Sequence, residues 1–295
     1  MPCGTWTITD ISDADLGLVQ ASAKAENPIS IETKQQAGGK WTVVITYPPC
    51  GDGQAEIKPS AEFSAVKDGL SVVSTIAKSI DGALPVPVVV DLSHHNWDNG
   101  LQPDFAAAKA AGLQGVIAKA SQGASYKDPT YAKTRALAKA QGLLWGAYHF
   151  STNAAPEAQI NNFLDSANVE DGDLFAIDFE RNEQDPQNSA SPGVGLQLLK
   201  LCQAKIGRAP VLYTGSYMYD LFGKTPQPDF AAYRVWWARY GPAPKVHPSW
   251  QAYLLWQYTD GMHGPDPHKL NGIGYADYSH FNGASHDLAK QWAES

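Results

Sequence analysis

The sequence predicts an α/β fold: a compact, partly degenerate (β/α)8-like barrel with a small β-rich N-terminal domain. From about Pro87 onward, short continuous runs of apolar residues alternate with longer amphipathic segments. Alternation of this kind is typical of a parallel sheet that is covered by helices. Eight apolar runs follow one another in this part of the chain, and this is the number of strands in a β/α barrel.

The expected barrel strands can be located one by one. The first five are separated by the helical patterns DFAAAKAAG, DPTYAKTRALAKAQG, APEAQINNFLDSA and GVGLQLLKLCQAKIG. The last three follow shorter or irregular connections, so we expect the barrel to be degenerate there. A doubly wound open sheet is the alternative, but no glycine-rich phosphate loop follows the first strand. The eight runs are PVVVDLS, GVIAKAS, LLWGAYHF, LFAIDFE, PVLYTG, YRVWWARY, YLLWQYT and YADYSHF.

The N-terminal part of the chain has a different pattern. Residues 1–66 are predicted to form the β-rich domain, because ISIET and KWTVVITY flank QQAGG and so indicate a hairpin with glycines at its turn. Residues 67–86 end in a segment punctuated by prolines and are predicted to be a linker. The barrel is expected to occupy residues 87–295.

The charge balance excludes several kinds of partner. The 295 residues include 22 Lys and Arg against 30 Asp and Glu, a formal charge of −8. A nucleic-acid partner requires a basic surface, and so does docking on an anionic membrane. No apolar stretch is long enough to span a bilayer, and the first residues lack the basic and apolar parts of a signal peptide.

The three cysteines form neither a metal-binding cluster nor a disulfide framework. Cys3 and Cys50 both belong to the N-terminal region, and whether they pair stays open. Cys202 lies in an apolar helical run, so we expect it to be a buried thiol.

Acidic residues occur at the ends of several expected strands. Asp91 closes the first strand, Asp178 and Glu180 close the fourth, and Asp277 lies in the last. The C-terminal ends of barrel strands converge on one mouth, where active sites are built. Because gathering carboxylates in one place is unfavourable unless function requires it, these four acids are predicted to form a catalytic cleft.

The pattern AIDFE assigns different tasks to two of these acids. Side chains alternate along a strand, so Asp178 and Glu180 share one face with the small Ala176. Neighbouring carboxyls disfavour ionising together, and a glycosidase needs one protonated and one ionised carboxyl. We expect Glu180 to be the general acid/base and Asp178 its anionic partner. The alternative, a strand-end pair that binds loop amides or Arg181, does not explain the two further acids.

Aromatic residues mark the same strand ends. We expect five of them to line a polysaccharide groove, because sugar rings stack on flat aromatic faces. Two of the five are two residues apart in the seventh strand and must face the same side. The alternative for one or two is a place in the barrel core. The five residues are Tyr148, Tyr213, Trp237, Trp256 and Tyr258.

Other chemistries find less support in the sequence. His94 and His95 are adjacent, so we expect one to line the cleft and the other to pack outside. No HExxH or CxxC pattern indicates a metal site, and no GxSxG elbow indicates a serine hydrolase. We expect neither a metal nor a cofactor.

The strand motifs, taken in order, resemble those of glycoside hydrolase family 25, the Chalaropsis-type lysozymes. The resemblance begins at about Val86 and extends to the C-terminus. Members of this family are N-acetylmuramidases that cleave the β-1,4 bond between N-acetylmuramic acid and N-acetylglucosamine. The motifs are VVVDLSHHN, GVIAKASQG, GAYHF, FAIDFE, PVLYTGS, WWARY, LLWQYT and ADYSHFNG.

This resemblance implies roles for single residues. Glu180 takes the position of the family's catalytic acid/base, and Asp178 is the first acid of its D-x-E motif. Asp91 and Asp277 match the strand-one and late aspartates, and Asn96 matches a position that is often Gln or Asn. The aromatic positions that typically line the groove correspond to Tyr148, Trp237, Trp256 and Tyr258.

One position departs from the family pattern. Gln122 stands where many members have an acidic residue before Gly. Because Gln122 is not one of the expected catalytic acids, we expect altered local hydrogen bonding and retained activity.

The resemblance also implies a biological setting. The expected partner is bacterial peptidoglycan, with no nucleic acid and no membrane, and a monomer is favoured. Action outside the cytoplasm without a signal peptide would need phage-type lysis or a dedicated secretion route. The N-terminal region lies outside the resemblance; a wall-binding or targeting role is favoured for it, and a packaging tag or a structural cap is the alternative.

Two rival functions are kept. A barrel chitinase carries the pattern D-x-D-x-E, but Ala176 stands four residues before Glu180. A non-catalytic wall-binding protein has no reason to retain clustered carboxylates.

Overall fold

The computed structural model describes residues 5–11, 30–35, 41–46, 89–98, 100, 102–283 and 287–294. The chain divides into two compact units, Met1–Ala77 and Lys78–Ser295. The predicted linker, residues 67–86, lies outside the described residues, and so do Cys3 and Cys50. The predicted domain boundaries therefore stay predictions.

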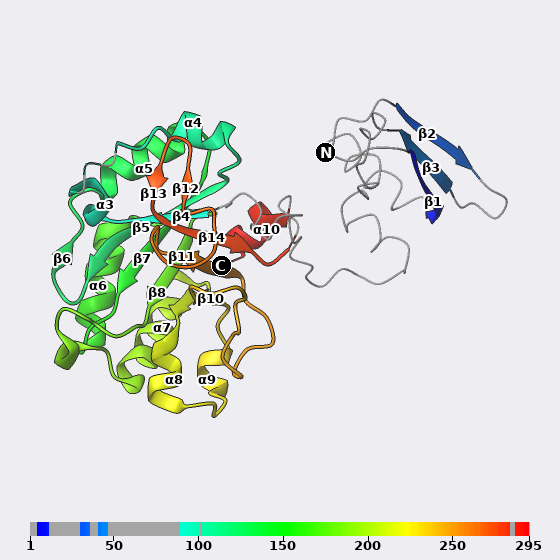
Figure 1. The fold of residues 1–295 in the computed structure, drawn as a ribbon. Coiled ribbons are helices and arrows are strands. Elements are labelled where there is room, and N and C mark those ends of the chain that lie inside the picture. Colours follow the sequence, from blue (N-terminus) through cyan, green and yellow to red (C-terminus); the bar gives the residue numbers. More distant parts are fainter. Residues whose placement is uncertain are drawn as a thin grey trace. The chain divides into compact units, whose positions relative to one another are not determined.

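The described part of the first unit is a three-stranded antiparallel sheet (Figure 1). It contains β1 (Thr5–Ile11), β2 (Ser30–Gln35) and β3 (Trp41–Thr46) in the order β1-β3-β2. Strands β2 and β3 pair along their whole length, as the predicted hairpin requires.

The second unit is a closed barrel of eight strands. Neighbouring strands follow the order β4-β14-β11-β10-β9-β8-β7-β5, and pairing of β4 with β5 closes the ring. Each of the eight predicted apolar runs contains one of these strands, so the predicted fold class is confirmed. The strands are β4 (Val89–Leu92), β5 (Gly115–Gln122), β7 (Leu144–Phe150), β8 (Leu174–Asp178), β9 (Val211–Thr214), β10 (Val235–Ala238), β11 (Leu255–Thr259) and β14 (Asp277–Phe281).

The degenerate part of the barrel is its last strand. Strand β14 runs antiparallel to both of its neighbours, β4 and β11, whereas the other barrel pairs are parallel. Its first residue therefore lies at the end of the barrel where the parallel strands finish. Asp277, at the start of β14, is consequently the register partner of Asp91 in β4.

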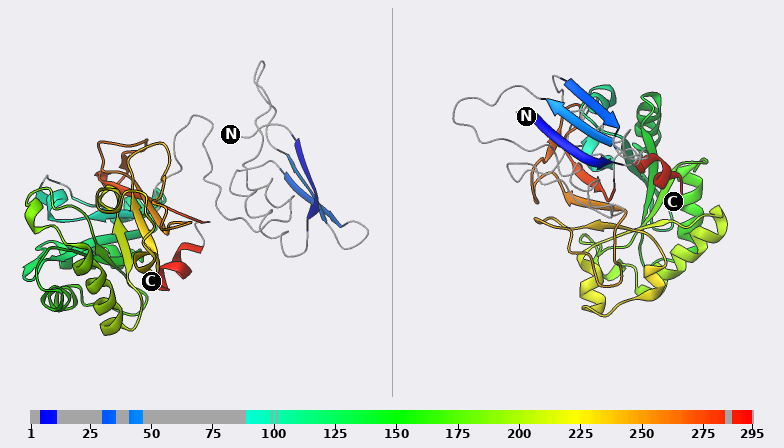
Figure 2. Two further views of the ribbon diagram at one scale, coloured as in Figure 1. Left: turned by 90° about the horizontal axis from the view of Figure 1, so that it is seen from below. Right: turned by 90° about the vertical axis from the view of Figure 1, so that its right-hand side faces the viewer.

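Four helices follow the early strands, where the sequence predicts them. They are α4 (Phe105–Ala110), α5 (Tyr131–Ala140), α6 (Pro156–Ala167) and α7 (Pro192–Ile206). Helices α5, α6 and α7 lie on the outside of the strands (Figures 1 and 2). Helix α7 begins at Pro192 after the Ser191 cap and ends at Ile206, and the next residue, Gly207, has a φ of 83° that suits glycine.

The remaining elements are short. Among the described residues, no helix has the length and apolar character needed to cross a membrane. The short helices are α3 (His94–Asp98), α8 (Ser216–Phe222), α9 (Pro228–Ala231), α10 (Leu288–Ala293) and the 3₁₀ turn Pro186–Asn188. The short strands are β6 (Tyr126–Lys127), β12 (Lys269–Leu270) and β13 (Gly274–Tyr275).

Trp292 of α10 packs against the starts of two strands, at the end of the barrel away from the mouth. It is 1% exposed and belongs to the central apolar cluster. A Cβ built on Gly115 would lie 2.8 Å from its ring, and one on Gly146 would lie 3.2 Å away. The indole nitrogen donates a hydrogen bond of 2.7 Å to the carbonyl oxygen of Trp145. The absence of side chains at these two glycines thus provides the space that the Trp292 ring occupies.

Removal of this side chain should cost considerable stability. We expect Trp292→Ala to lower the free energy of unfolding by about 3–5 kcal/mol, because it leaves a large cavity that the strands cannot close. Urea unfolding measures the change. The exposed Lys290→Ala on the same helix is the matched control and should stay within about 0.5 kcal/mol of the wild type. Equal stabilities for the two variants would contradict this packing role.

Candidate active site

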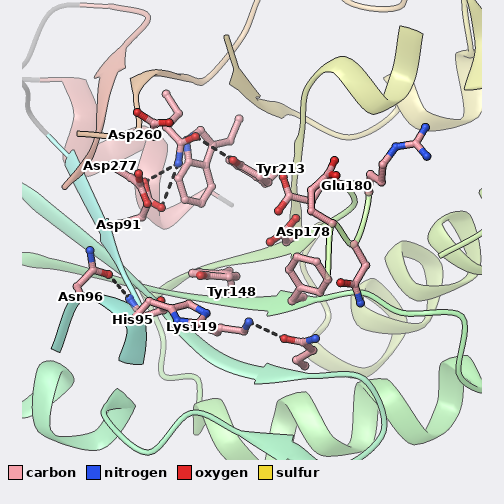
Figure 3. Close-up of a pocket in the computed structure, with 18 of the residues that line it drawn as sticks. Asp91, His95, Asn96, Lys119, Tyr148, Asp178, Glu180, Tyr213, Asp260 and Asp277 are labelled. Carbon is pink, nitrogen blue, oxygen red and sulfur yellow. Dashed lines mark hydrogen bonds between the residues drawn. The ribbon is translucent and has the colours of Figure 1, made fainter. Parts of the chain in front are cut away.

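A pocket of about 430 Å³ lies at the mouth of the barrel, where the parallel strands end. Figure 3 shows Asp91 and Asp277 together on one side, with Asp178 and Glu180 across from them. The structure therefore brings acids from three strands that lie far apart in the sequence around one cavity. The predicted site residues that line the pocket are Asp91, Asn96, Tyr148, Asp178, Glu180, Tyr213 and Asp277.

The segment after β8 positions Glu180. The backbone N–H of Phe179 donates a hydrogen bond of 2.9 Å to the carbonyl oxygen of Tyr213, so extended pairing continues past the strand end. The Phe179 ring packs on α7, where a Cβ on Gly195 would lie only 2.7 Å from it. Because the side chains alternate, Glu180 lies on the same inward face as Asp178.

Desolvation in this pocket raises the pKa values of its acids. Loss of water raises the pKa of the Glu180 carboxyl to about 7, and the Lys119 ammonium opposes the rise. The pKa of Asp277 also rises to about 7, through desolvation and then the charges of Asp260 and Glu180. Burial and then Glu180 raise the pKa of Asp178 well above its usual range. The set therefore supplies both protonated and ionised carboxyls near neutral pH.

One oxygen of Asp178 stands out among the polar atoms that the structure describes. Asp178 is 4% exposed, and its Oδ1 is buried without a hydrogen-bond partner. A buried carboxylate oxygen left in this way costs free energy unless something else satisfies it. Because Asp178 lines the pocket, a bound molecule can provide the missing donor or positive charge.

Lys119 is a pocket residue that the sequence reasoning missed. It belongs to β5, is 6% exposed, and donates a hydrogen bond of 2.6 Å to Oε1 of Gln122. Its ammonium lies 4.8 Å from the centre of the Phe150 ring. A lysine inside the otherwise uncharged run GVIAKAS was the available signal, because a buried cation needs nearby anions. The carboxyls of Asp178 and Glu180 supply them.

Three predicted groove residues lie elsewhere, and the prediction for them was wrong. Trp237, Trp256 and Tyr258 do not line the pocket and are at most 1% exposed. Their polar atoms donate to the backbone carbonyl oxygens of Pro244, Arg239 and Pro267, at 2.8, 2.8 and 2.7 Å.

Strand alternation explains this correction. In β10 and β11 the neighbouring residues Trp236 and Gln257 face the pocket, so the residues beside them must point outward. Trp256 and Tyr258 do share one face, as expected, but it is the outer one. Tyr240, which follows β10 and is 41% exposed, is an aromatic residue of the pocket that the prediction missed.

The rings of the two histidines after β4 are in contact, with their centroids 3.9 Å apart, but only one of them lines the pocket. His95 lines the pocket, whereas the His94 ring nitrogen Nδ1 lies 2.9 Å from Oδ2 of Asp128. Asn96 accepts a hydrogen bond of 2.8 Å from the backbone N–H of Ser93, so its side chain also holds the turn after β4.

A closed barrel with several carboxyls and rings at its mouth is the arrangement of barrel glycosidases. The model of the family "Glycosyl hydrolases family 25" matches residues 90–266. The chain belongs to this family.

Curated relatives match at moderate identity. The uncharacterized protein YegX of Escherichia coli O157:H7 is 28% identical over 194 residues, which are 65% of this chain and 64% of YegX. The chain thus spans a little less than two thirds of the length of that relative. Lysozyme M1 of Streptomyces globisporus is 25% identical over 204 residues, covering 62% of this chain and 67% of the lysozyme.

Solved structures show the same fold. The muramidase from Acremonium alcalophilum superposes with a TM-score of 0.58 at 26% identity, covering 72% of this chain and all of the muramidase. The bacterial lysozyme from Streptomyces coelicolor gives a TM-score of 0.58 at 25% identity, covering 69% of this chain and 96% of the lysozyme.

The raised pKa of Glu180 should make stability depend on pH. Its folded pKa of about 7 exceeds the usual 4.5, so the folded state binds the proton more tightly and loses stability as pH rises through this window. We expect Glu180→Gln to stabilise the protein more at pH 8 than at pH 5, by about 1–3 kcal/mol. Urea unfolding at both pH values measures this difference.

Comparison of the variant with the wild type at each pH separates the contribution of Glu180 to stability from that of groups whose pH dependence has the opposite sign. Burial lowers the pKa of His149 and His280 to about 4, so these residues reduce stability on the acidic side. The exposed Glu157→Gln on α6 removes a charge without relieving a desolvated carboxyl and serves as the control. A pH-independent effect of Glu180→Gln would contradict the assignment.

Proposed function

We propose that this chain is a peptidoglycan hydrolase, an N-acetylmuramidase that cleaves the β-1,4 bond between N-acetylmuramic acid and N-acetylglucosamine. One observation carries the proposal: Glu180, with its raised pKa, shares a pocket with Asp178, Asp91 and Asp277 in a chain of glycoside hydrolase family 25. The similar proteins named lysozyme and muramidase support the same substrate.

In this proposal Glu180 is the general acid/base. A carboxyl that keeps its proton to about pH 7 can protonate the glycosidic oxygen as the bond to the leaving sugar breaks. The resulting carboxylate, partly exposed at the mouth, can then take a proton from the attacking water. Lys119 stabilises the carboxylate form between these steps.

Asp178 is the proposed anionic partner. Its unpartnered Oδ1 can stabilise the positive charge that develops on the sugar ring as the glycosidic bond breaks. The same oxygen can either attack the anomeric carbon or hold the N–H of the substrate's acetamido group so that its carbonyl oxygen attacks. Both roles require an ionised carboxyl at this place.

The proposed sugar-binding residues are those that the pocket presents. Tyr240 is exposed enough to offer a ring face, and Asn96 and Tyr148 are partly exposed at the wall. Tyr213 is only 8% exposed and contributes through its hydroxyl. Aromatic faces with a few polar groups are typical of carbohydrate pockets.

The proposed setting follows from this substrate. The chain would act as a monomer on bacterial cell walls, outside the cytoplasm and without a nucleic-acid or membrane partner. The β-rich N-terminal unit would bind the wall or direct the enzyme to it.

Digestion of purified peptidoglycan tests the proposal. We expect soluble muropeptides with a reducing muramic acid end, identified by mass spectrometry. Glu180→Gln should lose activity by about 10³-fold or more, because the leaving sugar departs unprotonated. The control Glu157→Gln should retain the wild-type rate.

The same digestion separates the rivals. Binding to the wall without new reducing ends would show a lectin, and cleavage of chitin oligomers in preference to peptidoglycan would show a chitinase. Either outcome would falsify the proposed activity.

The rate should depend on pH as a bell on the acidic side of neutrality. Asp178 must be ionised and Glu180 protonated, and the pKa of Glu180 near 7 sets the alkaline limb. Lys119 lowers the pKa of both acids, so Lys119→Met should move both limbs upward by about one pH unit. The exposed Lys200→Met on α7 should leave the profile in place. A rate that rises steadily into alkaline pH would contradict the assignment.

A further inference from the structure

Two acids of the pocket are direct neighbours across one strand pair. Asp91 in β4 and Asp277 in β14 are register partners in an antiparallel ladder, so their side chains project from the same face. Both line the pocket, and the charge of Asp277 raises the pKa of Asp91. Two carboxyls in this relation take up one proton between them before either is fully ionised or fully protonated.

A neighbouring amide distinguishes the two acids. Nε2 of Gln257, in β11, lies 3.1 Å from Oδ1 and 3.0 Å from Oδ2 of Asp91. The two oxygens of one carboxylate lie in nearly the same direction from this nitrogen, so one N–H is shared between them. None of the hydrogen bonds between side chains of the described residues ends on the Asp277 carboxyl. Burial and the charge of Asp277 raise the pKa of Asp91 well above its usual range, and the Gln257 donor opposes this rise because it favours negative charge on Asp91.

Two phenols hold the amide in this orientation. Oε1 of Gln257 accepts hydrogen bonds from the hydroxyls of Tyr213 and Tyr240, each at 2.8 Å. Both lone pairs of the amide oxygen are thus occupied, and the nitrogen must face Asp91. The reverse orientation would place the amide oxygen against the carboxylate, which only a protonated Asp91 tolerates.

We propose that Gln257 is a positioning residue that assigns the charge of this pair, keeping Asp91 ionised and leaving the proton on Asp277. Asp91 then contributes a fixed anion to the pocket, and Asp277 an O–H donor. Tyr213 and Tyr240 act through Gln257 by holding its amide. The part of this inference that concerns reaction rate rests on the proposed function, whereas the assignment of the charge does not.

Titration of the carboxyl carbons by ¹³C NMR tests the assignment without any substrate. Aspartate-labelled protein gives one signal for each carboxyl, and Asp91→Asn and Asp277→Asn identify the two that matter. As pH rises, the Asp91 signal should show the larger share of the first ionisation, and the Asp277 signal the larger share of the second. The other titratable groups that interact with Asp91 or Asp277 are Glu180, Asp178, Asp260, Tyr148, Tyr213, Tyr240 and Tyr278.

Variants of Gln257 should change this order. Gln257→Met removes the donor, so the pKa of Asp91 should rise by about one or more and the two signals should titrate together. Gln257→Glu keeps acceptors for both phenols but sets a third carboxyl against Asp91, so Asp277 should ionise first. The exposed Gln203→Met on α7 is the control and should leave both signals unchanged.

Two results would overturn the inference. One is that Asp277 ionises before Asp91 in the wild type. The other is that the order survives in a folded Gln257 variant, with folding verified by circular dichroism. Gln257→Glu matches the native side chain in shape, so it decides the question if Gln257→Met does not fold.

A kinetic measurement gives a second readout. Gln257→Met should lower kcat by about tenfold with little change in KM. In an Asp91→Asn background the same change should lower kcat by less than about twofold, because the Asp91 carboxylate on which Gln257 acts is absent. Equal effects in the two backgrounds would show that Gln257 acts independently of Asp91. If the wild type releases no muropeptides, the proposed function fails, and the titration still decides the role of Gln257.

Discussion

Repulsion among carboxyl groups in one poorly hydrated pocket is the constraint on which the barrel mouth depends. Asp91, Asp178, Glu180 and Asp277 come from three strands, and each has a raised pKa. Such a cluster is stable only if each carboxylate is either protonated or stabilised by a nearby cation or hydrogen-bond donor. At the barrel mouth, the Lys119 ammonium stabilises the carboxylates of Asp178 and Glu180, and the Gln257 amide donates a hydrogen bond to Asp91.

Closure of the barrel by an antiparallel strand creates this constraint. A parallel last strand would bring its C-terminal end to the mouth, whereas β14 brings its first residue there. Asp277 thereby becomes the direct neighbour of Asp91, although 186 positions separate them in the printed numbering. The same closure places β11 beside β14. Gln257 in β11 can therefore donate its hydrogen bond to Asp91. Topology thus supplies both the repulsive pair and the group that relieves it.

The sequence predicted the strands and the acids because each has a local signal. An apolar run that ends in an acidic residue identifies both a strand and the end that faces the mouth, as in PVVVDLS and LFAIDFE. A strand with large side chains on both faces has no such signal for its inward face. In VWWA and LWQYT, large side chains occupy both faces, and only three-dimensional packing decides that Trp236 and Gln257 point inward and Trp237 outward. The hydrogen bonds of Gln257 join residues far apart in the chain and have no sequence signature.

The partner of Lys119 shows how a neutral residue affects the pocket. Gln122 accepts the hydrogen bond of the ammonium but brings no charge of its own. An acidic residue at this position would compensate the charge of the lysine locally. With Gln122, the positive charge of Lys119 is left to act on Asp178 and Glu180, and it lowers the pKa of both. Gln122 therefore orients Lys119 without compensating its charge, and uncompensated charge in a poorly hydrated site acts over a longer range.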